Sequence, residues 1–431
     1  MIITFVSPFK PIICGIADYT DFVTRECPAG KWAVLSFNLN DREAPLSQEH
    51  PSPTTPVWYV IPSRTTFTAT SILEGLGSDR DQVIWFQHEF GIWRDNARFV
   101  DMLAELPRVK VVTLHSLHFQ SHETVYGLRR HEHLFLSQLL PHTDAITVFS
   151  NGVRRAVLRA FPEFHEKVHL LQHGTHLFPG LATLSRAQAK AMIHDYLVDE
   201  SPLDQESKKQ LREQRVFLDP GTTVLGGAGF ITASKGIDLL FHACDTLQQM
   251  LPERKIAAVY VGLLRESGGV EDSRCAEALK SKSRGKQHFL LETYLPAHML
   301  PVLLRALDVY FYWPTDCTQS GILAHALGAG ATIACRDMEG VGEAVRIAGG
   351  LTSHKFGDLI AGIQRLILEP GLGDQASEKA SVYAQSFSWK NQASRHFELA
   401  EELCRYRVGG LATASPPAPD SSADGEPSSV G

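Results

Sequence analysis

Polar side chains follow two apolar runs in the first third of the chain. His88 and Glu89 come directly after residues 82–86, and His115 follows residues 110–114. Because the carboxyl ends of parallel strands meet at one edge of a sheet, these side chains are expected to gather in a polar cleft. A local hydrogen bond explains either histidine equally well on its own. Two histidines at one edge favour a site.

A glycine stands after a third apolar run of the same segment. Residues 2–6 form this run, and the loop after them ends in Cys14-Gly15-Ile16-Ala17-Asp18, before a helical pattern begins. A glycine at this place lets the backbone approach a bound group closely. The alternative is that Gly15 only permits a tight turn.

The second half of the chain holds a glycine-rich loop with one lysine. Gly226-Gly227-Ala228-Gly229-Phe230 leads through Lys235 and Gly236 into the helical residues 237–247. Backbone N–H groups at such a helix start, beside an ammonium group, suit a phosphate. The loop is not a P-loop, because Gly236 stands where Ser or Thr would hold magnesium. The alternative is a glycine-rich turn with a solvated lysine.

A further candidate anion site lies at the start of a helix near residue 320. Ser320 and Gly321 precede a run of small residues that ends in Gly328 and Gly330. The polar N-terminus of such a helix suits an anionic diphosphate. Close packing of the helix against a sheet would explain the small residues without any ligand.

Two other chemistries fit the sequence less well. His115, His118 and His122 have a spacing that would bring them near one helical face, as a zinc site requires. However, no H-E-x-x-H follows His88, and no carboxylate or thiolate stands at a ligand spacing. A serine hydrolase would need a G-x-S-x-G elbow, which the sequence lacks.

The elements that must position these residues alternate between strand and helix. Continuous apolar runs predict strands that are buried on both faces of a parallel sheet, because no polar alternation marks a solvent face. They occur at residues 2–6, 32–37, 57–61, 82–86, 110–114, 145–149 and 168–171, and again at 223–225, 256–261, 286–290, 308–311 and 332–334. The pattern predicts an α/β chain with two doubly wound domains.

The domain boundaries follow from changes in composition. We expect a first domain at residues 1–176, a connector with charged, solvated helices at 177–215, a second domain at 216–386 and a closing helix at 387–407. Residues 408–431 are rich in Pro, Ser, Gly, Ala and Asp. Such a segment cannot offset its ordering entropy, so we expect a disordered tail.

The overall composition argues against several classes of protein. The 431 residues carry a formal charge of −7 without a long Lys/Arg block, so a nucleic-acid partner is not supported. Seven cysteines without C-x-x-C spacing indicate a reducing compartment, and we expect the cytoplasm. The N-terminus shows no signal-peptide pattern, and no apolar stretch reaches the length of about 20 residues that a membrane span needs.

Six motifs, in this order, resemble the GT-B retaining glycosyltransferases of family 4 over the chain to about Tyr406. These are a CGIA loop, a Q-H-E-[FY]-G-I strand end, a T-L-H strand end, an H-G turn, a G-F-x-x-x-x-K-G loop and an S-G-x-L-A helix. They stand here at residues 14–17, 87–92, 113–115, 173–174, 229–236 and 320–324. The resemblance implies a GT-B architecture, in which two Rossmann-like domains face each other across a cleft and the last helix crosses back to the first domain.

The resemblance also implies roles for the residues. His115 would lie near the transferred sugar, and Lys235 would bind the donor diphosphate. The expected catalytic residues are His115, Lys235 and Asp316. The expected donor-binding residues are Gly229, Phe230, Lys235, Arg265, Ser320, Gly321, Ile322 and His325, and the expected acceptor-side residues are Gly15, Asp18, His88, Glu89 and His173.

The implied reaction is transfer of a hexose, with retention of the anomeric configuration. The donor would be a UDP-, GDP- or ADP-type nucleotide-diphospho sugar, and the acceptor a carbohydrate-type or other hydroxyl. No metal ion and no cofactor is expected, so basic groups and helix ends would stabilise the leaving diphosphate.

The donor loop departs from the family pattern. Many members have an Arg beside the Lys, but Phe230 stands at that position here, and Arg265 is the candidate to replace it. The usual pair of glutamates is replaced by Cys317 and His325, with Asp316 as substitute for the first. Two alternatives therefore stay open: an inactive GT-B protein that binds or regulates a partner, and a sugar-nucleotide epimerase, which would need acid/base carboxylates in the cleft.

Overall fold

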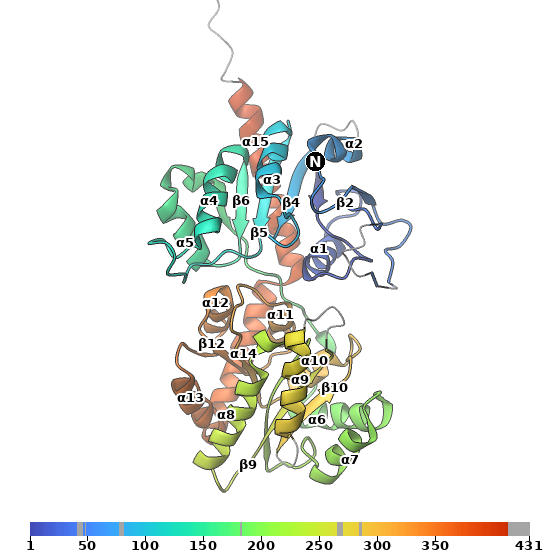
Figure 1. The fold of residues 1–431 in the computed structure, drawn as a ribbon, viewed down its shortest axis with the longest axis vertical. Helices are drawn as coiled ribbons and strands as arrows, with labels where there is room; N and C mark the ends of the chain where they lie inside the picture. The colour runs from blue at the N-terminus through green and yellow to red at the C-terminus, as the bar shows by residue number, and fades with distance from the viewer. Residues whose placement is uncertain are drawn as a thin grey trace, which may run out of the picture.

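The computed structural model describes residues 1–40, 46–47, 49–76, 82–181, 183–264, 270–283 and 287–412. Two lobes lie one above the other, and each is built on a parallel sheet (Figure 1). The first sheet has seven strands in the order β3-β2-β1-β4-β5-β6-β7, and the second has six in the order β10-β9-β8-β11-β12-β13. The two predicted doubly wound domains are confirmed.

The first sheet is covered by helices on both faces. Its strands are β1 (Ile2–Val6), β2 (Trp32–Phe37), β3 (Val57–Ile61), β4 (Gln82–His88), β5 (Val109–Leu114), β6 (Ala145–Val148) and β7 (Val168–Leu170). Helices α2 (Ala69–Leu76), α3 (Asn96–Glu105), α4 (Arg130–Leu139) and α5 (Asn151–Ala160) pack on one face, and α1 (Gly15–Arg25) packs on the other. Burial on both faces explains why these strands read as unbroken apolar runs.

The second domain repeats this plan. Its strands are β8 (Thr222–Ala228), β9 (Lys255–Gly262), β10 (His288–Glu292), β11 (Val309–Tyr312), β12 (Ile333–Arg336) and β13 (Leu351–Ser353). The helices are α8 (Ile237–Met250), α9 (Val270–Ser283), α10 (Leu300–Ala306), α11 (Gly321–Gly328), α12 (Glu339–Ile347), α13 (Phe356–Leu368) and α14 (Pro370–Ser386). The sequence pattern missed the three-residue edge strand β13, which is too short and too exposed to give an apolar run.

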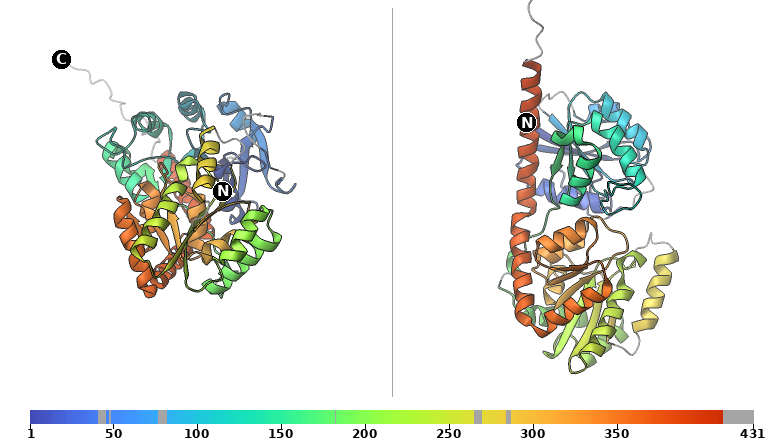
Figure 2. Two further views of the ribbon diagram at one scale, coloured as in Figure 1. Left: turned by 60° about the horizontal axis from the view of Figure 1, so that its bottom comes forward. Right: turned by 90° about the vertical axis from the view of Figure 1, so that its left-hand side faces the viewer.

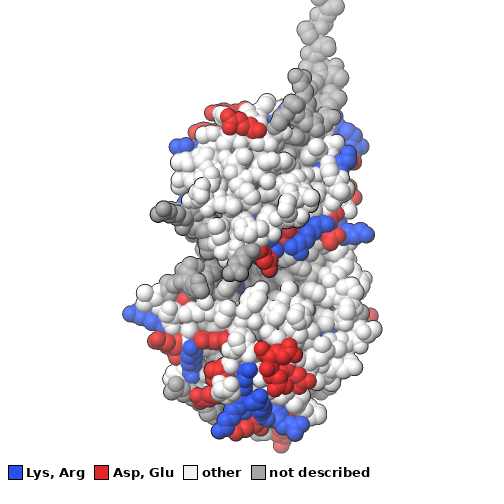
Figure 3. Space-filling view, turned by 90° about the vertical axis from the view of Figure 1, so that its right-hand side faces the viewer, with Lys and Arg blue, Asp and Glu red and all other residues white. Residues whose placement is uncertain are grey.

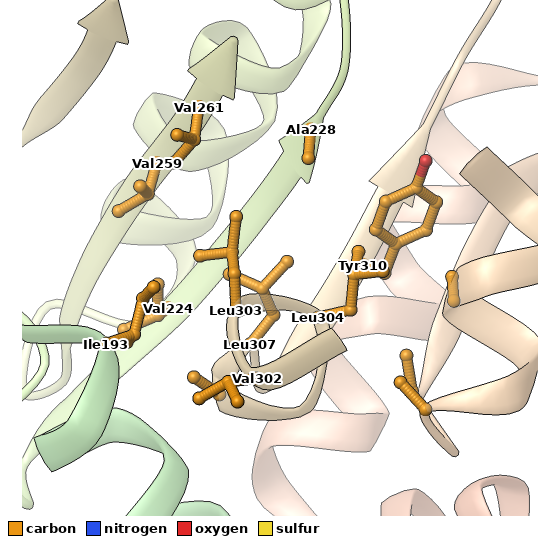
Figure 4. Packing of buried hydrophobic residues seen from close by; sticks show 14 of the residues in the cluster. Ile193, Val224, Ala228, Val259, Val261, Val302, Leu303, Leu304, Leu307 and Tyr310 are labelled. Carbon is orange, nitrogen blue, oxygen red and sulfur yellow. The ribbon is translucent and has the colours of Figure 1, made fainter. Parts of the chain in front are cut away.

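The segment between the domains differs from our expectation. Its helices α6 (Arg186–Asp195) and α7 (Gln205–Gln214) are not simply solvated, because Ile193 and Leu211 are fully buried in the core of the second domain. Figure 4 shows Ile193 beside Val224 of β8, with Leu303 of α10 close by. A narrow apolar stripe is enough to dock a helix whose other sides are charged. Residues 177–215 therefore pack as part of the second domain over their described length.

The last helix, α15 (Trp389–Ala412), follows α14 of the second domain and runs along the side of the first lobe (Figure 2). Its residues Trp389, Ala393 and Ala400 are buried in the first domain's core, on the face that also holds α1. The expected crossing helix is thus confirmed. It continues to Ala412, five residues beyond the expected end, and the rest of the expected disordered tail, residues 413–431, lies outside the described residues.

The surface carries charges of both signs. On the face drawn in Figure 3, Lys and Arg are interspersed with Asp and Glu, and no broad region has one sign. Such a surface gives no footprint for nucleic acid on this face. Within the described ranges, no helix combines the length and the apolar character that a membrane crossing requires.

Candidate functional site

His115 lies at the end of β5 and is almost completely buried. Its Nε2–H donates to Oε1 of Gln87 at 2.7 Å, and its ring packs edge-on against Tyr19 and Phe149 at centroid distances of 4.9 and 5.0 Å. Burial lowers the pKa of His115 well below its ordinary value, and the nearby His173 adds to this effect. The imidazole is therefore neutral at pH 7, with Nδ1 left as an acceptor.

Glu89 lies beside His115 at the same edge of the sheet. Its carboxylate accepts from the backbone N–H of Gly91 at 2.7 Å and from the Ser116 hydroxyl at 3.3 Å. The Ser116 bond joins the loops that follow β4 and β5, and the Gly91 bond closes the turn after β4. Glu89 therefore lies against Ser116, the residue after His115, at the shared edge of β4 and β5.

The side chain of His88 turns the other way. It is buried against Phe135, with stacked rings 4.5 Å apart, and burial lowers its pKa to about 3. Side chains of neighbouring strand residues point to opposite faces of a sheet. The Gln87 side chain therefore contacts His115 on one face, while the His88 ring packs in the core on the other. The expectation that His88 lines the cleft is therefore wrong, although its carbonyl accepts from the N–H of His115 at 3.0 Å.

Gly15 and Asp18 lie in the first turn of α1, next to this edge. Gly15 has open space where a Cβ would stand, and both residues are exposed. Cys14, the residue before the helix, does not cap it with its side chain. The first turn of α1 therefore has no side-chain cap.

The glycine-rich loop of the second domain places Lys235 at the ends of β8 and β11. Gly236 has φ +67°, and a Cβ there would overlap the carbonyl oxygen of Trp313, so only glycine fits. The Lys235 ammonium lies 3.5 Å from the Tyr312 hydroxyl, and within the described ranges it has no carboxylate partner. It lines a small pocket with Gly227, Ala228, Gly236, Tyr260 and Tyr312.

Next to this pocket, α11 begins at Gly321. Ser320 precedes it in an extended conformation and gives no side-chain cap, so the first N–H groups of the helix stay available. Gly229 has φ +123°, which favours glycine, and Phe230 after it is 42% exposed at the mouth of the loop. Lys235, Gly229 and the start of α11 therefore lie along one edge of the second sheet. Arg265 lies outside the described residues.

Two other residues expected on the donor side have different surroundings. Ile322 packs against the second domain's core. His325 donates from Nδ1–H to the Gly321 carbonyl at 2.9 Å, and its ring lies against His176 at 3.8 Å between centroids. His173, expected on the acceptor side, packs with Tyr19 and Trp389. His325 and His173 thus join a group of rings between the domains.

Asp316, expected to be catalytic, bridges the two domains. Its carboxylate accepts from Arg129 at 2.8 Å and from Nε2 of His118 at 3.2 Å, both in the first domain. The Arg129 guanidinium lowers the pKa of Asp316, with His118 adding to the effect, so this carboxyl stays ionised. An ion-paired carboxylate is a poor proton donor or acceptor, and the geometry supports a structural role instead.

The zinc alternative gains no support from the geometry. The Nδ1 of His118 faces Glu132 and its Nε2 faces Asp316, so both ring nitrogens have partners. Among the residues that the structure describes, no group of three or more His, Cys, Asp or Glu side chains could hold a metal ion.

Sequence reasoning missed three residues that matter here. Gln87, although part of the quoted motif, was not recognised as the partner of His115. Glu339 and Glu343 of α12 reach across to the first domain. Their spacing of four residues puts them on one face of a helix, but the sequence alone gives no sign of what that face meets.

No protein-family model matches the chain. It is 28% identical over 185 residues to a D-inositol 3-phosphate glycosyltransferase of Rhodococcus jostii strain RHA1. The match spans 42% of this chain and 40% of that protein, which is less than half of either.

Solved structures resemble nearly the whole chain. An α,α-trehalose-phosphate synthase (UDP-forming) of Burkholderia vietnamiensis has a TM-score of 0.63 at 11% identity, over 96% of this chain and 100% of that one. A sucrose-phosphate synthase of Thermosynechococcus elongatus has a TM-score of 0.63 at 16% identity, over 95% and 99%. These likenesses concern the fold, and they confirm the expected GT-B architecture.

Proposed function

We propose that this chain is a glycosyltransferase that moves a hexose from a nucleotide-diphospho sugar to an acceptor hydroxyl, with retention and without a metal ion. The carrying observation is Lys235, a lysine without a carboxylate partner in the described residues, at a glycine loop beside the uncapped start of α11. Support comes from the partial sequence match to an inositol-phosphate glycosyltransferase and from the fold shared with sugar-phosphate synthases.

On the donor side, Lys235 and the first N–H groups of α11 would bind the diphosphate. Both offer positive charge at the place where the leaving group gains negative charge, which is how a site lowers the barrier without a metal. A fold relative, the trehalose-6-phosphate enzyme of E. coli, was solved with UDP-2-fluoro glucose. A UDP-sugar is therefore the first donor to test, with GDP- and ADP-sugars beside it.

On the acceptor side, Gly15, Asp18 and Glu89 would face the incoming hydroxyl. His115 would meet the transferred sugar as a neutral acceptor through Nδ1, because its Nε2–H is held by Gln87. Glucose-6-phosphate is bound in one Burkholderia relative of the same fold, so sugar phosphates are suitable acceptors to try.

A binding protein without activity is the second candidate. Phe230, Cys317 and His325 replace charged residues of the family, and the Cys317 thiol lies 3.5 Å from the Tyr312 hydroxyl. An epimerase has less support, because Asp316, a carboxylate it would need, is engaged by Arg129.

A thermal-shift screen of UDP-, GDP-, ADP- and TDP-sugars tests the proposal, since a ligand that binds only the native state raises Tm. We expect one donor class to raise Tm of the wild type and to raise it much less in Lys235→Ala. A shift of equal size in Lys235→Ala would remove the assignment of that residue. No shift with any donor would contradict the transferase and favour the inactive binding protein.

A further inference from the structure

Two buried glutamates lie on one face of α12, where the second domain meets the first. Glu339 is 5% exposed and Glu343 is 7% exposed. Burying an ionised carboxylate is costly unless hydrogen bonds compensate it. For both residues, these bonds come from the first domain.

Glu343 binds the N-terminus of α5. Its Oε1 accepts from the backbone N–H of Asn151 at 2.6 Å and from Nδ2 of the same residue at 3.1 Å, and its Oε2 accepts from the N–H of Gly152 at 2.8 Å. A negative charge at a helix start is stabilised by the helix dipole. The carboxylate therefore caps a helix of the other domain.

Glu339 makes a similar contact with the loop after β5. Its carboxylate accepts from the N–H groups of Phe119 and Gln120 at 2.7 and 3.2 Å, and its own N–H donates to Oε1 of Gln120 at 3.1 Å. Glu339 has φ +46°, which is unfavourable for a residue with a side chain. The contacts across the domains accompany this strained conformation.

These contacts reach the residues of the proposed site. Phe119 lies four residues after His115, and the Thr318 hydroxyl of the second domain donates to the His115 carbonyl at 3.1 Å. Thr318 in turn lies just before Ser320, where α11 begins. Docking of α12 thus fixes the His115 loop against the loop that leads to the donor side.

We propose that Glu339 and Glu343 are positioning residues that dock the second domain on the first and so bring the two halves of the site together. This inference rests on the proposed function, in which the donor binds one domain and His115 belongs to the other. Carboxylates suit this task because water can solvate them when the domains separate. The backbone N–H groups satisfy them in one arrangement only, which gives the docked state a defined geometry.

The test uses Glu343→Gln in the full chain, with Glu378→Gln as the matched control, since Glu378 is an exposed residue of α14. The amide keeps the shape but removes the charge and turns an NH2 group toward N–H donors. Small-angle X-ray scattering should show a larger radius of gyration for Glu343→Gln and no change for Glu378→Gln. Turnover of the donor found by thermal shift should fall tenfold or more, as an estimate of the cost of misplacing reacting groups, while donor KM changes less than about twofold.

A second variant distinguishes loss of docking from misfolding. Glu339→Gly removes the carboxylate and also relieves the positive φ, so it should open the domains without loss of helical circular dichroism. Scattering curves of both variants identical to the wild type would overturn the docking role. Larger dimensions in the variants, combined with no activity of the wild type on any donor, would support docking while contradicting the transferase.

Discussion

The two domains meet at two places that differ in chemistry. At the first, a ring cluster joins Tyr19, Phe22, His173, His176, His325 and Trp389, with the Trp389 Nε1–H donating to His176 at 3.3 Å. On the cleft side, Asp316, Glu339 and Glu343 bind polar groups of the first domain. The ring cluster is neutral and tightly packed, whereas the cleft side consists of charges that water can solvate. The two contacts should therefore respond differently to mutation and to pH.

Among the predicted variants, removal of the Trp389 side chain from the ring cluster should lower the stability of the protein most. Its side chain is 6% exposed, and a Cβ on Gly174 would overlap its ring, so the packing is tight. Truncation of a buried Trp costs about 3–5 kcal/mol. We expect Trp389→Ala to lower the free energy of unfolding by about 3 kcal/mol in urea denaturation.

The matched control is Trp58→Ala, because Trp58 is 47% exposed on β3. The free energy of unfolding of Trp58→Ala should fall by less than half of the decrease expected for Trp389→Ala. Equal losses in the two variants would show that Trp389 is not a special anchor and would remove the distinction between the two sides.

Acid pH should have a smaller effect and should act through the same cluster. Burial lowers the pKa of His173 to about 4 and also depresses the pKa of His176, while both titrate near 6.5 in the unfolded chain. The unfolded state therefore binds more protons between about pH 6.5 and 4. Stability that is fully present above 6.5 is lost as the pH falls through this window.

Urea denaturation at several pH values measures this loss. The His176→Gln variant should lose less stability than the wild type between pH 6.5 and 4, because one of the buried rings with a depressed pKa is gone. A pH dependence as steep as that of the wild type would show that other groups cause it.

The sequence predicted most of the fold but only part of the site. Strand ends could be located because apolar runs stop where loops begin, and this placed His115, Glu89 and Lys235 correctly at sheet edges. The sequence could not predict the face of the sheet on which the His88 side chain lies. A strand that is buried on both sides has no polar alternation to distinguish its two faces.

Contacts between the domains could not be predicted from the sequence for another reason. The sequence predicts a catalytic role for Asp316, because nothing in its neighbourhood along the chain reveals Arg129, 187 residues away. The contacts of Glu339 and Glu343 cannot be predicted from the sequence either. Their partners are backbone N–H groups, which every residue type except proline has. Such pairings depend on how two finished domains meet.

The role of His115 in sugar transfer is the central claim, and one rate measurement tests it most directly. The assay follows release of nucleoside diphosphate from the donor found by thermal shift, in wild type, in His115→Ala and in His165→Ala, whose histidine is exposed. We predict that His115→Ala binds the donor as well as the wild type but turns it over about 100-fold more slowly, while His165→Ala is unchanged. Turnover of His115→Ala equal to that of the wild type would contradict the account.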